Sequence, residues 1–431
     1  MTAAGHAAAT RRSPVKLSRT AIFATLAVVA LAALPLVLPS RGIGTAIQMQ
    51  VAALFALAFN ILWRQSRLLS FGHAAFFGIG MFATIHAMRA AAAGALPLPL
   101  PLLPLAGICA GLLLGVIVGF FATARTGTYF AMITLAFAEV IHQLAPQWES
   151  VFGGEAGLST TRMAWAGLSF ASNTQVYYLV LAWSVIATAG TYYFTQTPLG
   201  RLAFALGDNE MRVSFLGYRV RVAKTLVFAV SAMFAGLAGG LLAIANENVD
   251  YGVFSASISG LVVIHTFVGG AGSFLGPIIG AAGLTLFGSI ASDLTRLWVL
   301  YQGLVFVLVV MYLPQGIVPL VAQGLARGIG RRRWHAVRPA LAAFAGVVLA
   351  TSGAVFLAEI VSALVADPFA LQIEGGAISA KVWGATWRAN SIATWLVPAL
   401  AVGTGAWITR SALRRVRDCD RAHDRSESSP V

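Results

Sequence analysis

Apolar runs about as long as a bilayer is thick recur along this chain and constrain its fold more than any other feature. A helix needs about 20 apolar residues to cross a hydrocarbon core of about 30 Å, and it satisfies its own backbone polar groups on the way. The sequence therefore predicts an all-α, polytopic transmembrane helix bundle, with about ten core spans and about two extra C-terminal spans. The expected spans are 21–39, 44–63, 72–92, 97–123, 127–145, 175–194, 224–245, 255–270, 274–292, 297–314, 339–365 and 392–409.

Composition supports a membrane location and excludes other classes. Hydrophobic residues make up 58% of the chain and charged residues only 10%, whereas a soluble domain has about 25% charged residues. The net charge of +14 does not indicate nucleic-acid binding, because the basic residues lie in the loops between apolar runs. Cys109 and Cys419 have no metal-ligand spacing, so we expect no metal site, disulfide or cofactor.

The distribution of Lys and Arg predicts the orientation. With twelve spans and a cytoplasmic N-terminus, 23 of the 29 basic residues fall in cytoplasmic segments. Both termini are then cytoplasmic. The predicted divisions of the chain are a basic tail (1–20), a transport domain (21–320), a basic linker (321–338), a two-span extension (339–409) and a polar tail (410–431).

Two of the expected spans allow another interpretation. Segment 21–39 follows a basic tail and has the composition of a signal peptide, although its length favours a retained span. Segments 255–270 and 274–292 are short and meet at a glycine-rich corner, so together they can form one broken or re-entrant element.

Glycines at helical spacing predict close helix packing. The stripes are Gly111, Gly115 and Gly119; Gly236 and Gly240; and Gly272, Gly276 and Gly280. Small residues four apart let two helix backbones approach closely in a membrane.

A few polar residues inside the spans are candidates for the translocation pathway. Ionisable groups within a membrane are expensive and indicate function by default. Glu139 is the single acidic residue deep inside a clear span, and His142 falls on the same helix face. The alternative is a structural pair that fixes the helix register, and packing alone also accounts for the run at 69–80. The candidates are Ser70, Gly72, His73, Thr134, Glu139 and His142.

The glycine-rich segment 269–277 is not a nucleotide-binding loop. No G-x-x-x-x-G-K-[ST] motif occurs in the chain, and no nucleophile, base and acid pattern is present. We therefore expect no enzyme activity in this chain, and any ATP hydrolysis on separate subunits. A long mixed polar and apolar segment at 197–224 instead predicts a cytoplasmic loop that another protein binds.

Six segments resemble, in the same order, conserved stretches of the branched-chain amino acid ABC permeases of the LivM/LivH type, and the LivM branch fits better. The segments are 69–80, 127–139, 152–159, 197–224, 235–240 and 268–277, within roughly 45–320. The resemblance implies a permease subunit in the bacterial inner membrane that imports amino acids, branched-chain ones in particular. It also implies three kinds of partner: a second, similar permease, two ATPases, and a periplasmic or lipid-anchored binding protein.

By the same resemblance, segment 197–224 is the coupling helix that docks in an ATPase groove. The residues that match the family pattern there are Gly200, Arg201, Asp208, Asn209, Glu210 and Gly217. Leu206, Phe215 and Leu216 are available as apolar anchors for such a groove. The chain departs from the pattern at Phe204, Gly207, Arg212 and Ser214, and a glycine inside a helix costs about 1 kcal/mol relative to alanine.

Other functions remain open from the sequence. Members of the same ABC class carry urea, amides or aromatic acids. A different class is a proton-coupled secondary transporter that uses Glu139 and His142 as a relay. A third is a membrane scaffold that transports nothing. The long 197–224 segment and the scarcity of charge inside the spans favour the ATP-driven permease.

Overall fold

A computed structural model describes residues 19–165, 167, 169–295, 297–313, 315–319, 346, 349–350, 352–361, 372–374, 377–382, 385–388 and 391–427. The linker predicted at 321–338 and most of the basic tail at 1–20 lie outside these residues, as do parts of the predicted span at 339–365.

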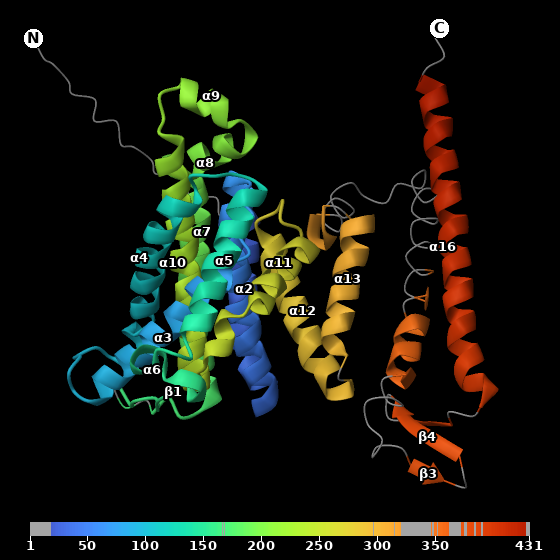
Figure 1. Cartoon of the computed structure of the whole chain (residues 1–431), viewed down its shortest axis with the longest axis horizontal. Coiled ribbons are helices and arrows are strands. Elements are labelled where there is room, and N and C mark those ends of the chain that lie inside the picture. Colours follow the sequence, from blue (N-terminus) through green and yellow to red (C-terminus); the bar gives the residue numbers. More distant parts are fainter. Residues whose placement is uncertain are drawn as a thin grey trace, which may run out of the picture.

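The chain folds mainly into helices that run roughly parallel to one another (Figure 1). The helices before the middle of the chain are α1 (Arg19–Ala33), α2 (Ser40–Ser66), α3 (His73–Ala92), α4 (Pro104–Ala122), α5 (Thr128–Leu144), α6 (Glu149–Phe152) and α7 (Asn173–Gln196). The later ones are α8 (Pro198–Asp208), α9 (Glu210–Phe215), α10 (Val220–Asn246), α11 (Ala256–Gly269), α12 (Leu275–Leu294), α13 (Trp298–Tyr312) and α16 (Ile392–Glu427). Short 3-10 helices are η1 (Leu34–Leu36), η2 (Leu100–Leu102), η3 (Gly154–Ala156) and η4 (Tyr251–Phe254).

The predicted class, an all-α polytopic bundle, is confirmed, but in the part of the chain that the structure describes fewer helices than predicted have both the length and the composition to span. Among the described residues, six helices have the length and composition to cross a membrane, or seven if α5 and the bent segment after it form one span. The apolar helices α11 and α13 have only 14 and 15 residues. They are shorter than the roughly 20 residues that a crossing needs.

Helix α10 lies at the centre of the bundle and packs closely against α3 and α4. A Cβ added to Gly80 of α3 or Gly107 of α4 would lie 2.2 or 2.5 Å from the carbonyl oxygen of Gly236 in α10. No side chain fits at these distances, so the backbones meet directly. Gly111, Gly115 and Gly119 continue the α4 contact, and Gly240 faces Thr84 and Pro104.

The second glycine stripe holds α11 against α12. A Cβ on Gly280 would lie 2.3 Å from the carbonyl oxygen of His265, and one on Gly276 would lie 2.1 Å from that of Gly270. Gly272 departs from the predicted stripe, because it is exposed in the corner before α12 and a Cβ there would meet nothing within 4 Å. The short helix α11 and the longer helix α12 are thus packed side by side across a sharp turn.

Two small sheets, which the sequence analysis did not predict, lie at one end of the molecule (Figure 1). Strands β1 (Leu158–Ser159) and β2 (Asn248–Val249) pair antiparallel, with Leu158 opposite Val249. The three strands β3 (Gln372–Glu374), β4 (Ala377–Val382) and β5 (Ala385–Arg388) form an antiparallel meander, with Ala380 opposite Trp387. Helices α8 and α9 project from the opposite end of the bundle.

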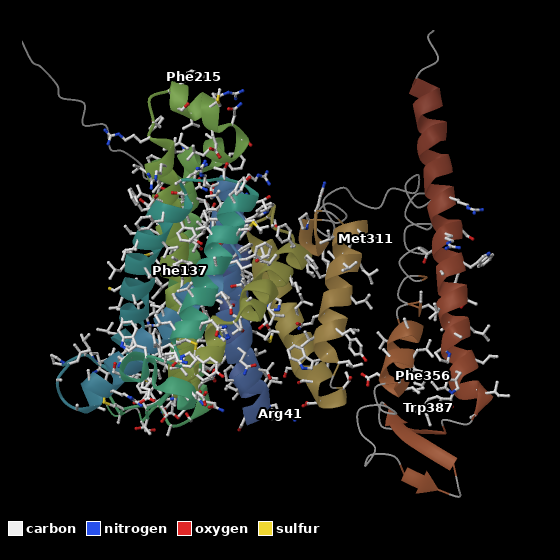
Figure 2. The ribbon with its side chains drawn as sticks, viewed as in Figure 1. Arg41, Phe137, Phe215, Met311, Phe356 and Trp387 are labelled. Carbon is white, nitrogen blue, oxygen red and sulfur yellow. The ribbon has the colours of Figure 1, made fainter. Side chains whose placement is uncertain are left out.

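The C-terminal extension packs on itself and contacts the core. The ring of Phe356, in the helix Ser352–Val361, meets that of Trp387 edge to face at 4.8 Å, as Figure 2 shows. Gly353 allows the same helix to approach Pro398 of α16 closely. The hydroxyl groups of Thr295 and Tyr301 both donate hydrogen bonds to the carboxylate of Glu359, which attaches this helix to the region of α12 and α13.

Candidate functional site

Segment 197–224 forms two short helices, α8 and α9, followed by a return into α10. The Thr197 hydroxyl caps α8 by accepting a hydrogen bond from the backbone N–H of Gly200 at 3.1 Å. Asn209 is extended and caps α9 by accepting from the N–H of Arg212 at 3.0 Å, so the segment is not one continuous helix. Gly217 adopts a φ of +85° in the turn back to α10.

The segment contains a small apolar core, and one of the three predicted anchors is buried in it. Leu206 is 1% exposed and packs with Val213 and Ala223, so its side chain is not available to a partner. Phe215 and Leu216 are 82% and 70% exposed at the tip, where the labelled Phe215 marks the end of the molecule (Figure 2). The amphipathic pattern of the sequence predicted that Leu206 is available to a partner protein. In the structure, that face of α8 packs against α9 and the start of α10 instead.

Glu210 and Lys224 form an ion pair that closes the segment. The Nζ atom of Lys224 lies 2.5 Å from Oε1 of Glu210, and the Lys224 side chain is 1% exposed. Glu210 also begins α9, where a negative side chain interacts favourably with the helix dipole. Its carboxylate therefore holds the first turn of α9 against the first turn of α10.

Gly207, one of the departures from the family pattern, has a structural reason. A Cβ at this position would lie 3.0 Å from the carbonyl oxygen of Gln65 and 3.0 Å from Cγ of Arg67. Helix α8 therefore rests directly on the C-terminal end of α2. The glycine costs helix propensity but allows this contact.

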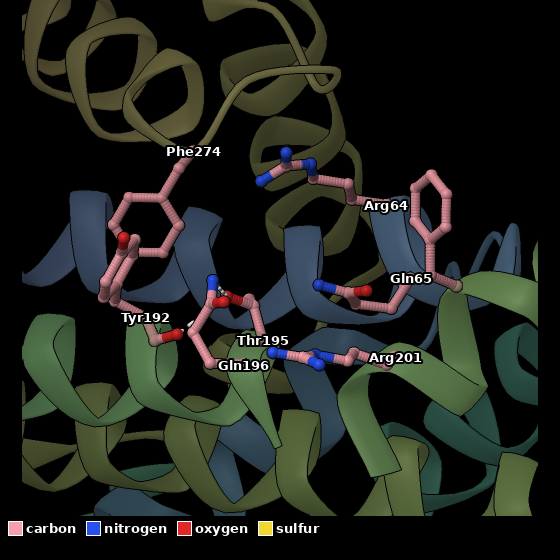
Figure 3. A pocket seen from close by; sticks show the side chains of 8 residues that line it. Arg64, Gln65, Tyr192, Thr195, Gln196, Arg201 and Phe274 are labelled. Carbon is pink, nitrogen blue, oxygen red and sulfur yellow. Dashed lines mark hydrogen bonds between the residues drawn. The ribbon is translucent and has the colours of Figure 1, made fainter. Parts of the chain in front are cut away.

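A cavity of about 330 Å³ lies beside α8, between α2, α7 and the corner before α12. Its lining residues are Arg64, Gln65, Tyr192, Thr195, Gln196, Arg201, Phe204 and Phe274. The guanidinium groups of Arg64 and Arg201 extend in the same direction past Gln65 (Figure 3). No acidic residue is among the lining residues, so the cavity is strongly basic.

The pathway candidates at the start of α3 form a packed contact. His73 is fully buried, and its Nε2 lies 2.8 Å from the hydroxyl oxygen of Ser231, which in turn donates to the carbonyl oxygen of Ala58. A Cβ on Gly72 would lie 2.0 Å from the carbonyl oxygen of Thr134. Ser70 and Thr134 are also buried. Gly72 thus brings the start of α3 against α5, and His73 joins α3 to α10.

Glu139 and His142 do not form a relay with each other in the described structure. Glu139 is exposed on α5 and its Oε1 accepts a hydrogen bond from Nε2 of Gln143 at 2.7 Å. His142 instead places Nδ1 3.2 Å from the carbonyl oxygen of Tyr251. The exposed face of α5 is otherwise apolar, with Met132 and Val140 both more than half exposed.

Comparisons with known proteins decide the family. The family described as "Branched-chain amino acid transport system / permease component" matches residues 42–313, more than half of the chain. The chain belongs to this family. It is a permease subunit of an ABC importer, a multi-pass protein of the bacterial inner membrane that works with ATPase and binding-protein components.

Curated relatives of this permease differ in what their names say they carry. The LivM permease of Escherichia coli strain K12 is 26% identical over 65% of this chain and 71% of its own length. LivM of Salmonella typhimurium is 27% identical over 68% of this chain and 74% of its own length. The ribose import permease RbsC of Haemophilus influenzae is 34% identical, but only over 23% of this chain and 32% of its own length. No solved structure matches the chain at a significant level.

The sequence analysis of this permease missed several residues that shape the site. Arg64 and Lys224 entered it only as charges in loops. Lys224 opens an apolar span, and a lysine at such a position is either at the membrane surface or paired. The sequence therefore indicated that Lys224 could be paired. Its partner Glu210, 14 residues earlier in the chain, is determined only by the fold.

Proposed function

We propose that this permease imports branched-chain amino acids. Its matches to the LivM proteins cover about two thirds of the chain, whereas the matches to the ribose permeases of Haemophilus influenzae and Bacillus subtilis cover 23% and 48%. The family match at residues 42–313 includes both helices α2 to α10 of the bundle and segment 197–224. Urea, amides and aromatic acids, which members of the same class carry, are the alternative substrates.

Helices α8 and α9 are the docking element for the ATPase in this proposal. The observation that carries it is the exposed apolar tip formed by Met211, Phe215 and Leu216, which projects beyond the bundle. An amphipathic helix that offers several apolar side chains docks readily in a groove of a partner. Gly200, Asn209, Glu210 and Gly217 then act by shaping the element, through two caps, an ion pair and a turn.

The orientation in this proposal places α8 and α9 in the cytoplasm. Arg64, Arg125 and Arg201 belong to the same end of the bundle as α9, and the guanidinium group of Arg221 bonds to Phe120 near the end of α4. Arg41 lies at the opposite end (Figure 2), and Arg89 contacts Ser159 in β1, also at that end. The excess of basic residues on the α9 side fits the cytoplasmic face.

The second permease of the transporter covers the exposed face of α5. Exposing a carboxylate such as that of Glu139 to lipid costs too much free energy, so Glu139 faces a polar pathway or another protein. Its only described hydrogen bond, to Gln143, is within the same helix and leaves it open to a partner. Glu139, Gln143 and the apolar residues around them form the face where the two permeases meet and substrate passes.

Purification of the transporter from its native membrane, followed by reconstitution, tests this function. We expect two ATPases, a second permease and a binding protein to copurify, and labelled leucine to accumulate in proteoliposomes only with internal ATP. Accumulation that an uncoupler abolishes at constant ATP would indicate the proton-coupled carrier instead. Accumulation of urea, an amide or phenylalanine in preference to leucine would overturn the substrate assignment and keep the ATP-driven class.

A further inference from the structure

The basic cavity beside α8 is not accounted for by docking of an ATPase or by a pathway along α5. It lies against α2, with α7 and the corner before α12 on either side. Helix α5, in contrast, packs mainly against α3, α4, α11 and η4 rather than against α7, α8 or α12. The cavity therefore opens on another side of the bundle than the face that carries Glu139.

Its two arginines have no partner in the part of the chain that the structure describes. The ion pairs found there join Arg41 to Asp293, Arg162 to Glu247 and Lys224 to Glu210. Neither Arg64 nor Arg201 takes part in a salt bridge or a side-chain hydrogen bond with a described residue. Two like charges in one cavity repel each other, and an anion between them removes that repulsion.

A polar side chain stands unsatisfied at the inner end of the cavity. A narrow extension of about 10 Å³ shares Arg64, Gln65, Thr195 and Phe274 with the main cavity and reaches Asn60. Asn60 is 2% exposed, its Oδ1 has no partner, and its amide nitrogen makes only a long bond of 3.4 Å to the carbonyl oxygen of Ser273. A buried amide group with unmade hydrogen bonds costs free energy unless a ligand supplies the missing partner.

Aromatic residues at the mouth place the cavity at the level of the membrane surface. The rings of Tyr192 and Phe274 meet edge to face at 5.4 Å, and Tyr192 and Phe204 are both about half exposed. Tyrosines gather at membrane interfaces, where their rings lie beside the lipid headgroups. The cavity is thus at headgroup depth, with its arginines outside and Asn60 toward the hydrocarbon.

We propose that this cavity binds the headgroup of an anionic phospholipid of the cytoplasmic leaflet. Arg64 and Arg201 hold the phosphate, because the planar guanidinium group matches phosphate oxygens in two parallel hydrogen bonds. The amide nitrogen of Asn60, whose hydrogen bond within the chain is the long one to Ser273, donates to an ester carbonyl at the glycerol level below. Basic pockets between transmembrane helices on the cytoplasmic side are suited to such headgroups.

A lipid held in this way links α2, through Arg64, to α8, through Arg201. Since α8 and α9 form the element that docks the ATPase in the proposed function, the lipid orders that element. Binding itself does not depend on the transported substrate or on the ATPase. A failure of lipid binding is therefore distinguishable from a failure of the proposed function.

The test is native mass spectrometry of the detergent-purified full chain with added phosphatidylglycerol, compared with phosphatidylcholine and with inorganic phosphate alone. We expect phosphatidylglycerol to bind preferentially, and R64Q and R201Q each to weaken it about tenfold, the effect of losing one charge-assisted contact. The matched control is R125Q, which removes an exposed positive charge at the same end but outside the cavity. It should bind as the unmodified chain does.

Three outcomes would overturn the proposal. In the first, R64Q, R201Q and R125Q all bind phosphatidylglycerol equally. In the second, phosphatidylcholine binds as well as phosphatidylglycerol. In the third, inorganic phosphate alone displaces the lipid at similar concentrations, which would make the site one for a free anion. Arg201 is exposed on α8, so R201Q keeps the test decisive even if R64Q folds poorly.

Discussion

The buried ammonium group of Lys224, at the start of α10, lies 2.5 Å from the carboxylate of Glu210, at the start of α9. This pair ties the start of α9, which carries the apolar tip, to the start of α10. The two residues are 14 apart in sequence, and the turn at Gly217 brings them together. In the proposed function, Glu210 therefore holds the tip in place, while Phe215 and Leu216 are the side chains offered to the ATPase.

Removal of one member of this pair should loosen the docking element. Glu210→Gln leaves a buried lysine without its counterion, and we expect a loss of about 1–3 kcal/mol in stability, less than for a fully buried pair because Glu210 is partly exposed. Transport should fall while membrane insertion persists. The double variant E210Q/K224M should regain much of the stability, which thermal unfolding in detergent measures. Equal melting of E210Q and the unmodified chain would contradict this role.

Replacement of the exposed tip should uncouple the ATPase without unfolding the permease. Phe215→Ser and Leu216→Ser remove apolar anchors that are open to solvent in the isolated chain. We expect each to weaken ATPase binding by about 1–3 kcal/mol, as for other interface anchors. The control is Leu206→Ala, which empties the internal core and should lower the melting temperature instead. Pull-down of the ATPases, together with melting curves, separates the two effects.

The close contact of α3 and α4 with α10 should not tolerate a methyl group. In Gly236→Ala the new Cβ would lie 2.3 Å from the carbonyl oxygen of Gly107, so the helices must move apart. We expect a loss of about 1–3 kcal/mol, typical of overpacking. Gly283→Ala in α12, where nothing lies within 4 Å, is the matched control and should leave the melting temperature unchanged or raise it. Similar melting of both variants would show that the contact is not tight.

The carboxylate on α5 should matter for transport or for assembly with the second permease. Glu139→Gln keeps the size of the side chain and its bond with Gln143 but removes the charge. We expect lower leucine uptake or less copurified second permease. The control Val140→Leu, on the same exposed side of α5, changes only apolar bulk. If uptake and assembly of E139Q both match the unmodified chain, the residue has neither role.

Local sequence patterns predicted the helices of the transport region well. The predicted spans 44–63, 72–92 and 224–245 correspond to α2, α3 and α10, with ends that differ by a few residues. Apolar length determines such helices because the backbone must satisfy itself wherever lipid surrounds it. The close helix packing at Gly236 was also predictable from the sequence, since a spacing of four residues puts small residues on one helix face.

Only the tertiary structure decided what each of these residues touches. The sequence placed Leu206 among the anchors and Gly272 in a packing stripe, but the fold buries the first and leaves the second in open space. The partner of Lys224 and the meeting of Arg64 with Arg201 in one cavity depend on helices far apart in the chain. Periodicity fixes the face of a helix, whereas the neighbour of that face is set by how the whole bundle packs.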